Sequence, residues 1–134
     1  MTQRYTYGRK DKLKSRKTLE AVFKQGKSFL VFPVKVVFYQ PEIVGYSLQT
    51  GVGAGTRHFK RAVHRNRIKR LMRESYRLHA APLQQYLLEQ QKPLAVFLLY
   101  IDKVLPDQEL LHQKMPVVIR RLIKELHEVD ATAT

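Results

Sequence analysis

Cysteine is absent from this sequence of 134 residues, which excludes disulfide bonds and thiolate-bound zinc. Long apolar runs are absent too, because the longest, residues 94–101, falls far short of the ~20 residues that a membrane helix needs. The first residues are polar and basic, with no apolar stretch typical of a signal peptide. These absences favour a cytoplasmic protein that does not enter a membrane.

Acidic residues are scarce. The 11 Asp and Glu are outnumbered by 25 Lys and Arg, which gives a formal net charge of +14. Such a charge is informative about partners, with nucleic acid first and an anionic membrane surface second. The apolar fraction of 44% is typical of a globular protein. We expect a single domain over residues 1–134 with one hydrophobic core and with flexible ends at 1–14 and 130–134.

The cations concentrate in residues 57–77, RHFKRAVHRNRIKRLMRESYR, where the only acid is Glu74. Turning each residue 100° from the last separates an apolar arc, roughly 120° wide, from a basic one. The apolar arc holds Ile68, Leu71, Met72, Ser75 and Leu78. The basic arc holds Arg65, Asn66, Lys69, Arg70, Arg73 and Arg77. Like charges four residues apart destabilise an isolated helix, so the helix predicted at about 60–79 is typical of a protein that binds a polyanion.

The rest of the chain alternates between helix and strand signals. Further helices are predicted at 15–25, between an N-cap at Ser15 and a stop at Gly26, and from Pro116 to about 129. Strands are predicted on both sides of a bend at Pro33, the second at 34–40, then at 43–50 as its hairpin partner, and at 93–101 with both faces buried. Connections are expected at 51–55, 82–92 and 106–115, the last two with partial helical character. The order α-β-β-β-α-β-α predicts an α/β sandwich, an α+β arrangement of one sheet with helices packed on it.

Few residues have the pattern of a catalytic site. The carboxylates are scattered, and Asp102, Asp107 and Glu109 surround a proline loop, where surface acids are the better interpretation. His58 and His64 belong to no metal-binding motif, and beside arginines each is more often a further hydrogen-bond donor. We therefore predict no catalytic and no metal-binding residue.

Two features leave alternatives open. The GVGAG run at 51–55 lacks the Lys and Ser/Thr of a nucleotide-binding loop, so it is a tight turn or a place where RNA approaches the backbone. Phe23, Tyr39 and Tyr46 either stack on unpaired bases or fill the core, whereas Phe38 fits the core better.

The segment KRAVHRNRIKRLMRESYR resembles the signature of the protein subunit of bacterial ribonuclease P, an Arg-Asn-Arg run within a basic helix, here Arg65-Asn66-Arg67. LKSRKTLEAVFKQGKSF is similar to the family's first helix, PLAVFLLY to its late strand and VVIRRLIKEL to its last helix. The resemblance covers residues 12–127. Two places depart from the family: Leu19 stands where an aromatic is frequent, and the stretch 53–57 is less basic.

This resemblance implies a mixed four-stranded sheet with a left-handed βαβ crossover, in a subunit of the ribonucleoprotein that removes the 5′ leader from precursor tRNA. It also implies that the RNA subunit is the catalyst and uses Mg²⁺, while the protein binds that RNA and the leader and broadens substrate use. No obligate protein partner is predicted. RNA contacts are expected from Arg57, Lys60, Arg61, Arg65, Asn66, Arg67, Lys69, Arg70 and Arg73. A leader cleft is expected from Leu19, Phe23 and Tyr39.

Two other functions use the same charge. A general RNA-binding or ribosome-associated protein would show no preference for tRNA that carries a leader. A protein-only nuclease would need a carboxylate cluster, which the sequence does not show.

Overall fold

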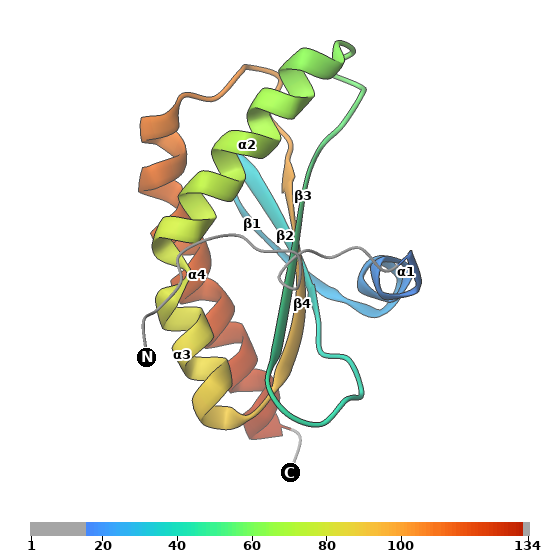
Figure 1. Cartoon of the computed structure of the whole chain (residues 1–134), viewed down its shortest axis with the longest axis vertical. Helices are drawn as coiled ribbons and strands as arrows, with labels where there is room; N and C mark the ends of the chain where they lie inside the picture. The colour runs from blue at the N-terminus through green and yellow to red at the C-terminus, as the bar shows by residue number, and fades with distance from the viewer. Residues whose placement is uncertain (1–15, 133–134) are drawn as a thin grey trace.

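The computed structural model describes residues 16–132, and within this range it contains four helices and four strands (Figure 1). The helices are α1 (Arg16–Gln25), α2 (Ala62–His79), α3 (Ala81–Gln90) and α4 (Gln108–Thr132). The strands are β1 (Lys27–Val31), β2 (Val34–Tyr39), β3 (Ser47–Ala54) and β4 (Pro93–Tyr100). They form one mixed sheet in the order β1-β2-β4-β3. The predicted N-cap Ser15 and the predicted flexible residues 1–14 and 133–134 lie outside the described range.

The sheet combines a hairpin with a crossover. β1 and β2 pair antiparallel across a tight turn at Phe32 and Pro33, and β2 pairs antiparallel with β4. β3 runs parallel to β4, so the chain must return to the same end of the sheet, which it does through α2 and α3. In Figure 1 β3 runs upwards in front, both helices lie to its left, and β4 runs upwards behind it. The crossover is therefore left-handed, against the general rule for such units.

Helices cover the two faces of the sheet unequally (Figure 1). α2, α3 and α4 lie on one face, and strand residues that point towards them, such as Val36 and Leu98, belong to the main core. α1 lies on the opposite face, where Val22, Val37 and Ala95 form a second, small core. The sheet is thus the middle layer between a thick helical layer and a thin one.

α1 ends at a glycine that the packing requires. The N–H of Gly26 donates to the carbonyl oxygen of Val22 at 3.0 Å and closes the last turn. A Cβ atom on residue 26 would collide with that carbonyl and come within 2.7 Å of the carbonyl oxygen of Phe38. The missing side chain lets the backbone pass directly from α1 into β1, which confirms the predicted stop.

The helical layer differs from the prediction in two helices. Most of the predicted connection 82–92 belongs to α3, which is held by the fully buried Leu83 and Leu87, so the element order has one helix more than the sequence predicts. α4 begins well before Pro116, the predicted first residue, and contains it. Burial of side chains on both sides of this proline outweighs the hydrogen bond that it cannot donate. Residues 130–132, predicted to be flexible, continue α4.

The third strand is also placed and paired differently. β3 pairs in parallel with β4, not as a hairpin with β2, and it includes Gly51 and Gly53, which the sequence predicts in a loop. Glycine weakens the interior of a strand unless close packing calls for it. A Cβ atom on Gly53 would come within 2.8 Å of the Phe97 ring, so that ring fills the space of the missing side chain.

Candidate nucleic-acid interface

Only one side of helix α2 packs into the main core. Its buried residues are Ile68, Leu71, Met72, Ser75 and Tyr76. They match the predicted apolar arc, except that Tyr76 is buried and Leu78 is 50% exposed. The hydroxyl of Thr50 on β3 donates to the Tyr76 hydroxyl at 2.8 Å within the core. This buried hydrogen bond helps to fix the rotation of α2 and therefore the direction of its other side.

That other side presents cations without acidic partners. The side chains of Arg57, Lys60, Arg61, Asn66, Arg67 and Arg70 are exposed, and those of Arg65, Lys69 and Arg73 are half-buried. We call these nine residues the basic surface; all of them belong to α2 or to the segment directly before it. Within residues 16–132 none of its cations pairs with an Asp or Glu. Its positive potential is therefore fully available to a polyanion.

The segment 55–61, which precedes α2 and includes three residues of the basic surface, is held in place by contacts with β4 and α2. Phe59 is 6% exposed, and the centre of its ring lies 6.2 Å from that of Tyr100. The carbonyl oxygens of Phe59 and Lys60 each accept a hydrogen bond from Nη1 of Arg65, both at 2.7 Å. The first turn of α2 contains no acid, so the positive end of the helix dipole adds to the potential here.

An aromatic pair lies on the opposite face of the sheet, beside α1. Phe23 is 53% exposed, and its ring meets that of Phe97 edge-on with centroids 5.1 Å apart. We call these two residues the aromatic step. Leu19 lies one turn before Phe23 and packs, partly buried, against the same small core. The structure thus brings the three predicted cleft residues, Leu19, Phe23 and Tyr39, around one small core and adds Phe97.

Phe97 is a candidate that the sequence does not reveal. β4 is apolar throughout, so it shows no alternation that would separate its two faces. In the structure Ala95 is buried under α1, whereas Phe97 on the same face is only partly buried. The prediction of a strand buried on both faces is therefore wrong at this position.

Strand register connects the aromatic step to the basic surface. Leu99, two residues after Phe97, pairs with Gly53 near the end of β3, where segment 55–61 leads on to α2. On its other side Leu99 pairs with Lys35 of β2, whose side chain is exposed. The row therefore places Gly53 and the exposed cation of Lys35 next to the Phe97 ring of the aromatic step.

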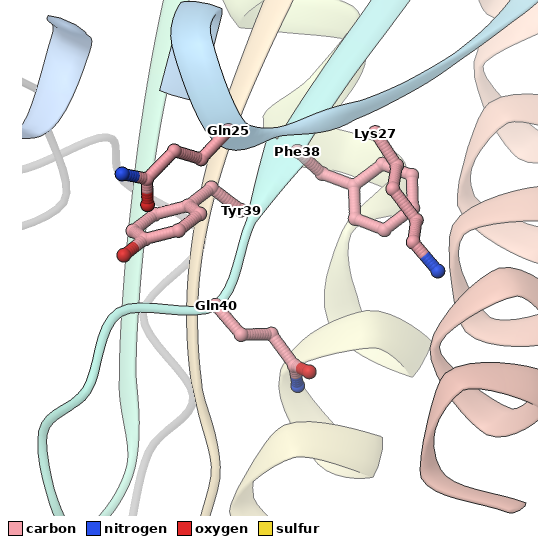
Figure 2. Close-up of a pocket in the computed structure, with 5 residues that line it drawn as sticks. All are labelled: Gln25, Lys27, Phe38, Tyr39 and Gln40. Atoms are coloured by element: carbon pink, nitrogen blue, oxygen red, sulfur yellow. The ribbon is translucent and has the colours of Figure 1, made fainter. Parts of the chain in front are cut away.

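Tyr39, the third predicted cleft residue, also packs partly buried against the small core, beside Gln25 at the C-terminal end of α1. Tyr39 is the last residue of β2. The first residue of that strand pairs with the end of β4, close to the segment that leads to α2, so Tyr39 lies at the end of β2 that is farther from this segment. Tyr39 lines a hollow of about 180 Å³ together with Gln25, Lys27, Phe38 and Gln40. Figure 2 shows the Tyr39 ring beside Gln25 on one side of β2, and Lys27 beside Phe38 on the other. The side chain of Phe38 itself is buried in the main core, as predicted.

The acids near the end of β4 support local structure. The carboxylate of Asp107 accepts a hydrogen bond from the first turn of α4, and that of Asp102 accepts one from the next backbone N–H. Burial, and to a lesser extent these two acids, raise the pKa of Tyr100 to about 12. No group of three or more His, Asp or Glu in the described range could hold a metal ion. None of the helices described is long and apolar enough to cross a bilayer.

A family model named Ribonuclease P matches residues 7–101, which include the first helix, the sheet and α2. The chain belongs to the ribonuclease P protein family. Two curated ribonuclease P protein components, from two strains of Porphyromonas gingivalis, are 34% and 33% identical to it over 126 residues. Each alignment covers 91% of this chain and 91% of the relative.

Solved ribonuclease P proteins share the fold. The protein from Thermotoga maritima gives a TM-score of 0.62 at 22% identity and covers 82% of this chain and 96% of its own. The protein from Staphylococcus aureus gives 0.60 at 19% identity and covers 84% of this chain and 94% of its own. These likenesses agree with the predicted α+β fold and its mixed four-stranded sheet.

Membership of the ribonuclease P family makes the chain the protein subunit of a ribonucleoprotein that processes the 5′ end of tRNA. Association with a ribonuclease P RNA follows from the same membership. The function inferred from the resemblance is confirmed. The individual RNA contacts stay predictions, which the geometry above makes specific.

Proposed function

We propose that this ribonuclease P protein binds the catalytic RNA through the basic surface. The observation that carries the proposal is a set of cations on α2 and the segment before it, without an acidic partner in the described range, on a helix whose opposite side is buried. Lys and Arg that neutralise phosphates release condensed counterions, and this release supplies much of the binding free energy. Mutual repulsion among these cations is relieved when the RNA is bound.

The same proposal places the single-stranded 5′ leader of precursor tRNA across the aromatic step. The path starts at the basic surface and passes the end of β3, where Gly53 leaves room for the Phe97 ring. Lys35 offers a cation to a phosphate, and Phe23 and Phe97 offer ring surface to a base. Stacking on such rings contributes roughly 1–3 kcal/mol per base. Because mature tRNA lacks the leader, these contacts favour substrate over product.

The contribution of the protein is positional. Its described residues offer no carboxylate cluster that fits Mg²⁺, so we place the metal ions and the hydrolysis on the RNA subunit. The hollow beside Tyr39 remains a proposed contact for a more distant part of the leader, since the Gln25 side chain lies beside the Tyr39 ring and Gln40 also lines the hollow.

A holoenzyme reconstituted from this chain and a ribonuclease P RNA tests the proposal. We expect precursor tRNA to bind more tightly than mature tRNA, and the difference to depend on the protein. If five phosphates are neutralised, the logarithm of the affinity falls with the logarithm of salt at a slope of about −3.5 to −4.5. A slope near −1, or equal affinity for the two tRNAs, would contradict the proposal; the second result is the one expected of a general RNA-binding protein.

A further inference from the structure

Arg65 differs from the other cations of α2 in what its side chain does. In the described part of the chain it is the one α2 cation with a side-chain hydrogen bond to the protein itself. Both N–H groups of Nη1 are used, because that nitrogen donates to the carbonyl oxygens of Phe59 and Lys60 at 2.7 Å each. By contrast, Arg67 and Arg70 are exposed.

These hydrogen bonds hold the backbone just before α2 from one side. From the other side, the buried ring of Phe59 holds it against Tyr100. The N-cap residue, Arg61, has an extended backbone and makes no side-chain capping hydrogen bond. The hydrogen bonds from Arg65 instead connect the first turn of the helix to the backbone before it. The exposed side chains of Lys60 and Arg61 therefore start from a fixed backbone.

We propose that Arg65 is a positioning residue, which holds Lys60 and Arg61 where they meet RNA phosphates. This inference rests on the proposed role of the basic surface. It assigns different tasks to the two arginines of the Arg65-Asn66-Arg67 run: the first orders the backbone of its neighbours, and the second is free to face the RNA. Fixing these side chains before binding lowers the entropy lost when they are ordered on RNA.

A double-mutant cycle on the reconstituted holoenzyme separates positioning from direct contact. Arg65→Met keeps the aliphatic stem and removes the donors, and it is made in the wild-type chain and in a Lys60→Ala, Arg61→Ala background. In the wild type we expect Arg65→Met to weaken RNA binding at least fivefold and to flatten the salt slope by about two units, because two phosphate contacts are loosened together. In the background lacking both cations we expect less than about a twofold effect.

Arg70→Ala is the matched control, since Arg70 is an exposed cation of the same helix. It should flatten the salt slope by about one unit in both backgrounds. Hydrogen exchange should become faster at the amides of residues 64 and 65, which donate to the carbonyl oxygen of Arg61, for Arg65→Met and stay unchanged for Arg70→Ala. This local readout holds even if Arg65→Met also lowers the melting temperature.

Three outcomes would overturn the inference. If Arg65→Met weakens binding by the same factor in both backgrounds, Arg65 contacts the RNA directly. If exchange at residues 64 and 65 is unchanged, the two hydrogen bonds do not order the start of α2. If Arg70→Ala leaves RNA binding unchanged and the salt slope of the wild type is near −1, the basic surface does not bind RNA. The inference is then wrong together with the proposed function.

Discussion

Replacement of Phe23 tests leader binding separately from folding. Its side chain is 53% exposed, so slightly less than half of the ~1.5–3 kcal/mol for a fully buried aromatic is lost on truncation. The edge-on contact with Phe97 adds about 0.5–1.5 kcal/mol. We expect Phe23→Ala to lower the free energy of unfolding by about 1–3 kcal/mol, which leaves a typical domain folded.

The effect on substrate binding should be of similar size and selective for precursor tRNA. Loss of one stacked base, at roughly 1–3 kcal/mol, corresponds to about 5- to 150-fold weaker binding of precursor tRNA to the holoenzyme. Mature tRNA should bind with unchanged Kd. Leu88→Ala is the matched control, because Leu88 is 49% exposed on α3, in the layer on the opposite face of the sheet. If precursor affinity is unchanged, or mature tRNA loses the same factor, the aromatic step does not hold the leader.

Three further predictions use other parts of the molecule. Arg70→Ala should flatten the salt slope of RNA binding by about 0.7–0.9 unit and leave the melting temperature unchanged, since its side chain is exposed; an unchanged slope would count against an RNA contact. Gly26→Ala should destabilise the protein by about 1–3 kcal/mol or more in a thermal melt, because its methyl group meets two backbone carbonyls. Burial, with a smaller effect of His112, lowers the pKa of His79, so the folded state favours its neutral form. The free energy of unfolding should therefore fall as the pH drops below about 6.5, the usual pKa of an unfolded histidine. Urea unfolding at several pH values should show a smaller fall for His79→Gln than for the wild type. Identical pH profiles of the two proteins would show that His79 does not contribute.

Much of the fold follows from local sequence patterns. α2 is predicted within a few residues, because its apolar and basic arcs are sharply separated at helical spacing. The glycine at 26 marks the end of α1 for a local steric reason. The cations of the basic surface can be predicted for the same reason as the helix, because a helix places residues three and four apart on the same side.

Other features depend on contacts between distant residues. Leu83 and Leu87 hold α3, yet two leucines at that spacing among glutamines are a weak signal until the main core is known. The pairing of β3 with β4, and the place of Gly53 under the Phe97 ring, depend on the order of strands in the sheet. The hydrogen bonds of Arg65 depend on the course of the backbone before α2, which composition does not specify.

The unequal covering of the sheet has a consequence for how this subunit can change. The thin layer rests on three buried side chains, Val22, Val37 and Ala95, while the thick layer contains most of the apolar interior. Substitutions on the outer side of α1 should therefore lower the free energy of unfolding only a little. If α1 holds the leader as proposed, substitutions there can change how precursor tRNA is bound while the thick layer keeps its structure.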